Sequence, residues 1–125
     1  DLNKTFSLIY TYLRPGGQFI FSWDHPFYAH IKSKEGKFYL YDSYQQEGKI
    51  VYDNFKGEET SLVVQKRKLS TYINALIRAG FIIEKVIESD VSSLYDTSHV
   101  EPSDRYYSLF KAQQFPTTFI IKASK

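Results

Sequence analysis

The segment Ser22–Phe27, with the sequence SWDHPF, contains residue types that could do chemistry. The imidazole of His25 titrates near neutral pH, so it could orient a substrate or accept a proton from it. Its neighbours Trp23, Pro26 and Phe27 are expected to contact a substrate bound beside the imidazole. The alternative is that the segment only shapes a proline turn. We take His25 as the candidate catalytic residue and its three neighbours as candidate substrate-binding residues.

Three further candidates lie outside this segment. Tyr28 follows it directly and could form part of a lid over the substrate, although aromatic residues in short hairpins more often form the core of a small subdomain. The basic run QKRK, residues 65–68, could anchor an anionic substrate, but such a run is more commonly a solvated face. Tyr72 lies in the first turn of the helix that follows, where it could face the same cleft or only pack.

The sequence predicts no metal site. His25, His30 and His99 include no pair at helical i, i+4 spacing and have no accompanying carboxylate motif. The chain also has no cysteine, which excludes thiolate ligands and disulfides.

The helix and strand that precede Ser22–Phe27 can be predicted from the spacing of apolar residues. Four apolar residues at spacings of four, three and four predict an amphipathic helix capped by Asp1: Leu2, Phe6, Ile9 and Leu13. Pro15 ends this helix, and the two glycines after it allow the chain to reverse. Residues 19–21 then lack polar alternation, which is typical of a strand buried on both faces of a parallel sheet. Ligands bind at the carboxyl ends of such strands, where His25 would lie.

The rest of the chain completes a predicted α/β domain spanning residues 1–125. Residues 27–66 contain short alternating segments separated by glycines at 36, 48 and 57, which predict an inserted region of antiparallel hairpins that could serve as a substrate lid. A helix capped by Ser70 and ending at Gly80 leads into a strand over 81–88. A loop, a short helix starting near Ser103 and a closing strand over 117–123 follow. Strands separated by helices favour an α/β sheet.

Composition narrows the function classes. The net charge of +2 and the pI of about 8.7 are too mild to indicate a nucleic-acid partner. No apolar run approaches the roughly 18 residues of a membrane span, and no signal peptide opens the chain, so a cytoplasmic location is expected. The chain starts inside a helical pattern and contains no methionine, so we expect it to be a fragment of a longer protein.

Three stretches resemble class I S-adenosylmethionine-dependent methyltransferases. YLRPGGQFIFSWDHPF resembles the helix before the fifth strand together with that strand, LSTYINALIRAGFIIEKVIES the next helix and the sixth strand, and FPTTFIIKASK the last strand. Arg67 is similar to a basic residue that recurs before this helix in a subgroup of the family, which selects it from the basic run as the candidate for substrate binding. The resemblance implies a C-terminal half of a Rossmann-like methyltransferase sheet, with three main strands, the last antiparallel.

The resemblance also implies S-adenosylmethionine as the cofactor of the whole protein and a small-molecule methyl acceptor as its partner. The glycine-rich loop that binds the cofactor in this family would precede Asp1, because no glycine here opens a helix after a strand. We therefore assign no cofactor-binding residue and expect the fragment alone to be inactive.

The family's strand order would place segments 18–23, 117–123 and 81–88 side by side, with both helices on one face. The other face and the edge at residues 19–21 would then be exposed, which predicts self-association. A noncatalytic binding or scaffolding module of the same architecture is the alternative to an enzyme fragment. Binding of single-stranded nucleic acid is disfavoured, because the charge is near neutral and the aromatics occupy core positions.

Overall fold

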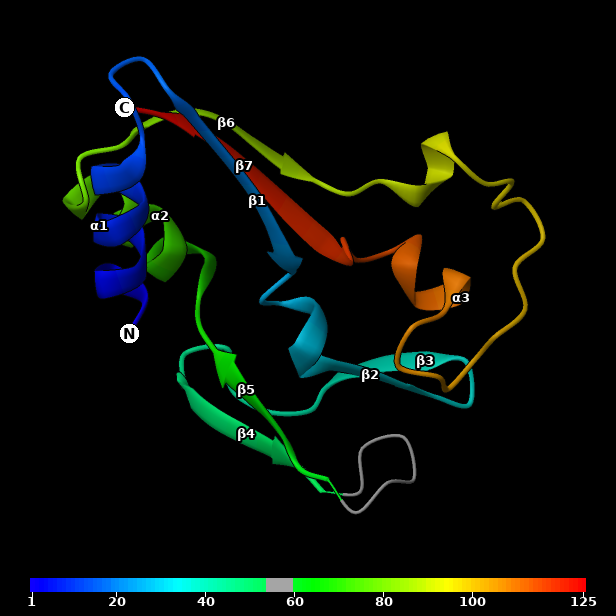
Figure 1. Cartoon of the computed structure of the whole chain (residues 1–125). Helices are drawn as coiled ribbons and strands as arrows, with labels where there is room; N and C mark the ends of the chain where they lie inside the picture. Colours follow the sequence, from blue (N-terminus) through cyan, green and yellow to red (C-terminus); the bar gives the residue numbers. More distant parts are fainter. Residues whose placement is uncertain (54–59) are drawn as a thin grey trace.

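A computed structural model describes residues 1–53 and 60–125, and for Tyr52 it describes the backbone alone. Its main sheet has three strands in the order β1 (Gln18–Asp24), β7 (Thr118–Ser124) and β6 (Ile82–Glu88), as Figure 1 shows. This order agrees with the expected one. β7 runs antiparallel to both neighbours, and every strand pair in the described part of the chain is antiparallel. The chain is thus mixed α/β with small antiparallel sheets, and the parallel pairing expected of a Rossmann-like sheet is not among them.

The open edge and uncovered face expected at residues 19–21 are confirmed, whereas the burial on both faces that their apolar run favoured is not present in this chain. β1 lies at an edge of the sheet, where Phe19 and Phe21 are half-buried but Ile20 between them is 58% exposed. Opposed residues of antiparallel strands share a face, so Phe19 and Phe21 lie beside Ala123 and Ile121 on the covered side. Ile20 points to the other side, which the described elements leave exposed.

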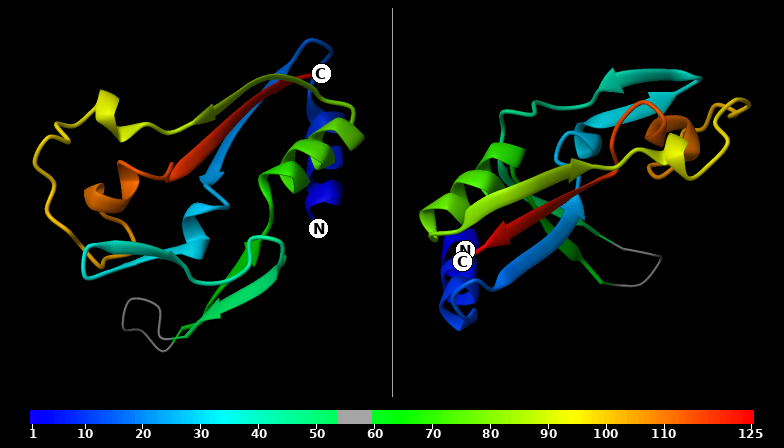
Figure 2. Two further views of the ribbon diagram at one scale, coloured as in Figure 1. Left: turned by 180° about the vertical axis from the view of Figure 1, so that it is seen from behind. Right: turned by 90° about the horizontal axis from the view of Figure 1, so that it is seen from above.

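Helices α1 (Leu2–Tyr12) and α2 (Leu69–Arg78) both pack on the first of these faces, as predicted (Figures 1 and 2). Between helices and sheet lies the main core, which consists of Phe6, Tyr72, Ala75, Leu76, Phe81, Phe119, Ile121 and Ala123. The core therefore sits entirely on one side of the sheet.

None of the helices in the described part of the chain combines the length and the hydropathy of a membrane span.

The helix ends follow the predicted capping with one exception. The Asp1 carboxylate accepts hydrogen bonds from the backbone N–H groups of Asn3 (2.9 Å) and Lys4 (3.3 Å), which confirms the N-cap of α1. The N-cap of α2 is Lys68 rather than Ser70, which lies inside the helix. Glu47 supplies the capping acceptor instead, because its carboxylate accepts from the Lys68 N–H at 2.8 Å. A contact distant in sequence thus decided where α2 begins.

Gly80 ends α2 in the predicted manner. Its φ of +101° is strained for any residue with a side chain, and a Cβ here would lie 3.0 Å from the Tyr10 ring. The Phe81 N–H then bonds the Leu76 carbonyl at 3.1 Å, and Phe81 is buried in the core. Glycine is therefore required both by the backbone and by the packing of α1 against this turn.

Two hairpins lie beyond the end of β1. The first pairs β2 (Ile31–Lys34) with β3 (Lys37–Leu40), and the second pairs β4 (Gly48–Tyr52) with β5 (Leu62–Lys66). Both were predicted from the alternating segments, although the expected glycine turn at residue 57 lies outside the described residues. In Figure 1 the second hairpin lies below the end of β1, where it can form a wall of a site.

The short helix near the C-terminus starts later than predicted. α3 spans Leu109–Ala112, and its N-cap is Ser108 rather than a residue near Ser103. The Ser103 carbonyl instead accepts a hydrogen bond from the Ser33 hydroxyl at 2.5 Å, which ties this loop to the first hairpin. Two short 3-10 helices, at Tyr28–His30 and Val91–Ser93, complete the described elements.

Candidate functional site

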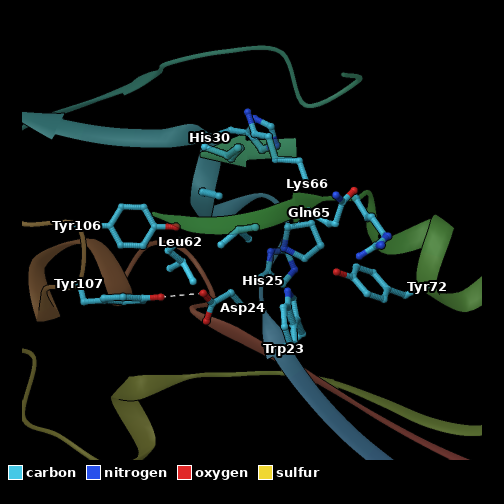
Figure 3. Close-up of a pocket in the computed structure, with 15 residues that line it drawn as sticks. Trp23, Asp24, His25, His30, Leu62, Gln65, Lys66, Tyr72, Tyr106 and Tyr107 are labelled. Atoms are coloured by element: carbon cyan, nitrogen blue, oxygen red, sulfur yellow. Dashed lines mark hydrogen bonds between the residues drawn. The ribbon is translucent and has the colours of Figure 1, made fainter. Parts of the chain in front are cut away.

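A cavity of about 570 Å³ lies at the carboxyl end of β1. Its walls come from four parts of the chain: the end of β1 and the turn after it, the second hairpin, the first turn of α2, and the loop before α3 (Figure 3). Most of the cavity wall is apolar or aromatic, with a few polar groups converging on it, which is typical of a small-molecule site. We call this cavity the main pocket.

Five of the seven residues predicted from the sequence line the main pocket: Trp23, His25, Pro26, Arg67 and Tyr72. They come from the end of β1 and from the start of α2, which are more than 40 residues apart in the sequence. Helix α2 packs on the same sheet face that β1 presents, so its first turn lies next to the strand end. The structure therefore brings the two predicted clusters into one site.

Phe27 and Tyr28 do not line the main pocket, and Tyr28 is not placed as a lid. Tyr28 is 1% exposed, and its hydroxyl donates a hydrogen bond to the Tyr106 carbonyl at 2.7 Å. Phe27 packs against Tyr44 and Phe115. Both side chains belong to a second aromatic cluster between the first hairpin and the α3 segment, because the 3-10 turn after Pro26 directs them there.

His25 holds the turn at the end of β1. Its Nδ1 accepts from the Phe27 backbone N–H at 3.2 Å, so Nε2 carries the proton that is shared with the Glu88 carboxylate at 2.8 Å. The His25 side chain is 8% exposed. Both ring nitrogens are thus engaged within the protein, which favours a structural and orienting role for His25 over that of a proton acceptor.

Several pocket residues were not identified from the sequence. Tyr106 and Tyr107 were assigned to a helix, and the sequence contains no signal that this loop folds back to β1. The Tyr107 hydroxyl donates to Asp24 Oδ2 at 2.8 Å, and Figure 3 shows both residues on the same side of the pocket. Asp24 could have been included among the candidate site residues, because it is a carboxylate at the end of a strand.

An ion-pair network supports the wall formed by the second hairpin. Asp42 accepts from both His30 and Lys66, and the latter two residues line the main pocket. Burial alone would raise the pKa of Asp42, but the hydrogen bonds and charges of Lys66 and His30 outweigh it and hold this pKa below its usual value. Asp42 therefore stays ionised and joins the two hairpins at the pocket.

Tyr72 and Arg67 form the opposite side of the main pocket. The Arg67 guanidinium lies 5.9 Å from the centre of the Tyr72 ring and is hydrogen-bonded to the Tyr72 side chain. Burial raises the pKa of Tyr72, and the hydrogen bond and charge of Arg67 only partly offset this effect. Tyr72 thus stays a neutral hydroxyl at neutral pH, and the Arg67 charge is held at the pocket.

Comparisons with solved structures identify the fold. A crystal structure of an S-adenosylmethionine-dependent methyltransferase from Mesorhizobium loti matches the whole chain with a TM-score of 0.71 and 26% identity. A protein from Listeria monocytogenes, provisionally assigned to the same activity, matches the whole chain with a TM-score of 0.71 and 24% identity. The chain has the fold of part of an S-adenosylmethionine-dependent methyltransferase. No protein-family model matches the sequence, and a search of curated proteins finds no significant match.

The chain covers 56% and 55% of the lengths of the two solved structures. That share is consistent with the expected resemblance to the C-terminal half of the fold. The cofactor of the family needs a glycine-rich loop between a strand and the following helix. Of the described glycines with a positive φ, Gly16 follows α1, Gly80 follows α2, and Gly36 and Gly48 belong to the hairpins. The described residues therefore do not fit the cofactor loop, and we assign none of them to cofactor binding.

Proposed function

We propose that this chain supplies the acceptor-binding side of an S-adenosylmethionine-dependent methyltransferase acting on a small molecule. The observation that carries the proposal is the main pocket, which lies at the carboxyl end of β1 in a chain that matches such enzymes over its whole length. Methyl transfer requires the acceptor to be held in line with the methyl carbon, so positioning and exclusion of water are the main tasks of the protein. Aromatic walls and a fixed turn suit these tasks.

We assign these tasks to particular residues. Trp23, Pro26 and Tyr72 would contact the acceptor. Arg67 would fix the orientation of the acceptor. His25 would hold the turn that carries Trp23 and Pro26. Residues 27–66 would form an inserted region that covers the acceptor, and the contribution of the second hairpin to the pocket wall supports this role. In this proposal residues 1–125 fold as one domain, and a cytoplasmic location stays a prediction.

The function is tested by titrating S-adenosylmethionine into two proteins. The 125-residue chain is expected to give no binding heat, because its described residues form no cofactor loop. A longer protein that includes the residues encoded upstream is expected to contain a strand, a glycine-rich loop and a helix there, and to bind the cofactor. Clear binding by the shorter chain would mean that the cofactor site is misplaced. An upstream sequence without the glycine loop would favour the noncatalytic module.

We also propose that the chain self-associates through the exposed side of its main sheet. Ile20, Ile82 and Ile87 are 58%, 67% and 41% exposed and point to that side, and β1 offers an open strand edge. Light scattering at rising concentration is expected to show a dimer or larger species. Ile20→Lys should shift this equilibrium toward the monomer, whereas Tyr12→Lys on the far side of α1 should not. A wild-type chain that stays monomeric at high concentration would refute the proposal.

A further inference from the structure

The main pocket carries opposite charges at two sides. Asp24 lies beside Tyr107, and Figure 3 shows Tyr72, the partner of Arg67, on the other side of Trp23. Within the part of the chain that the structure describes, neither Asp24 nor Arg67 has an oppositely charged side chain within ion-pair distance. The Asp24 carboxylate can accept more hydrogen bonds than the one from Tyr107, and the guanidinium has five N–H donors.

The other charged groups of the pocket are already paired. Lys66 and His30 share the Asp42 carboxylate, and the Nε2 of His25 contacts Glu88. A ligand would therefore meet one available anionic group and one available cationic group. Because both groups line one cavity of about 570 Å³, a molecule that fills the cavity can reach both.

The surface between these groups is apolar and aromatic. Trp23, which is 50% exposed, and Leu62 face the cavity beside Asp24 in Figure 3, and Tyr107 borders it on the same side. Indole and phenol rings next to a carboxylate attract an ammonium through their π-faces in addition to the ion pair. Such rings also bind the flat body of an aromatic ligand.

We infer that the acceptor is a zwitterion with an apolar or aromatic body, which places its ammonium or amine at Asp24 and its carboxylate at Arg67. This inference rests on the proposed function, which assigns the main pocket to the acceptor. It limits the acceptor to molecules whose amine and carboxylate lie at opposite ends of an apolar body. A purely anionic or uncharged acceptor would leave Asp24 without a cationic partner at the pocket wall.

Calorimetric titrations of the 125-residue chain with three probes test the inference at pH 7 and constant ionic strength. The probes are 4-(aminomethyl)benzoate, benzylamine, which lacks the carboxylate, and benzoate, which lacks the amine. The first probe is expected to bind at least about tenfold more tightly than either analogue, because only it engages both charged groups. Asp24→Asn should weaken binding of 4-(aminomethyl)benzoate and benzylamine by about tenfold and spare that of benzoate. Arg67→Gln should weaken binding of 4-(aminomethyl)benzoate and benzoate and spare that of benzylamine.

Asp96→Asn and Arg14→Gln serve as matched controls, because they remove the same charges from exposed positions outside the pocket. Equal affinity for the three probes, absence of binding, or losses no larger than those of the controls would each overturn the inference. The outcome is separable from that of the proposed function. If the longer protein binds S-adenosylmethionine while these titrations fail, the acceptor class is wrong and the enzyme assignment stands.

Discussion

Replacing Lys111 with methionine is expected to stabilise the chain by about 2 kcal/mol at pH 7. Lys111 is 1% exposed, and its Nζ has no hydrogen-bond partner among the described residues. Burial lowers the pKa of Lys111 from 10.5 to about 8, which corresponds to roughly 3 kcal/mol at about 1.4 kcal/mol per pKa unit. The Tyr28 and Tyr106 rings lie 3.6 and 4.5 Å from Nζ, and losing these cation–π contacts should offset about 1 kcal/mol of the gain.

The gain should depend on pH in a defined direction. Below pH 8 both the folded and the unfolded chain hold the Lys111 proton, so the full penalty of the buried charge is present. Between about 8 and 10.5 the unfolded chain binds more protons than the folded one, and the free energy of unfolding contributed by Lys111 rises with pH. The advantage of Lys111→Met should therefore shrink across this window and be lost at its upper end.

Urea denaturation at a series of pH values measures this difference directly. Lys34→Met, which removes an exposed lysine of β2, is the control and should change stability by less than about 0.5 kcal/mol. Taking differences from the wild type cancels the titration of the tyrosines that do not contact Lys111. A Lys111→Met protein that is less stable than the wild type at pH 7 would show that the ammonium has a partner in solution.

Replacing Ile121 with alanine is expected to destabilise the chain by about 3 kcal/mol, a typical cost for removing a fully buried isoleucine side chain. Ile121 is 0% exposed and lies in the core under α1 and α2. Its neighbour Ile120 points to the other side of β7, beside Ser22 and the partly exposed Ile87. Ile120→Ala should therefore cost less than about 1 kcal/mol in the same chain, because little apolar area is removed from water there.

The two isoleucines form a matched pair, since they lie in one strand and lose the same atoms and the same strand propensity. Chemical denaturation of both variants at low protein concentration isolates the effect of burial on one face. Equal costs would show that the second face is also covered. Repeating the comparison in the Ile20→Lys background would then tell whether self-association covers it. In a longer protein whose upstream residues pack on this face, the cost of Ile120→Ala should rise.

Much of the local structure could be predicted because its causes are local. The Asp1 cap, the Gly80 helix end and the alternation of the hairpins depend on residues a few positions apart. The errors arose where a distant contact decided the outcome: Glu47 moved the start of α2 from Ser70 to Lys68, and the Ser33 contact held the Ser103 loop out of a helix. Residues 19–21 look buried in sequence because apolarity does not record which neighbours are present.

The candidate site was likewise predictable only in part from the sequence. Trp23, His25 and Arg67 could be proposed from their residue types and from their places at the end of a strand and the start of a helix. The sequence alone also determined an α/β chain with an aromatic turn at the end of its first strand. Only the tertiary structure joined this turn to Tyr72, brought Tyr107 to Asp24 and buried Tyr28 away from the pocket. The reason is physical: residue spacing specifies the direction of a side chain within its own element, whereas packing between distant elements decides what that side chain meets.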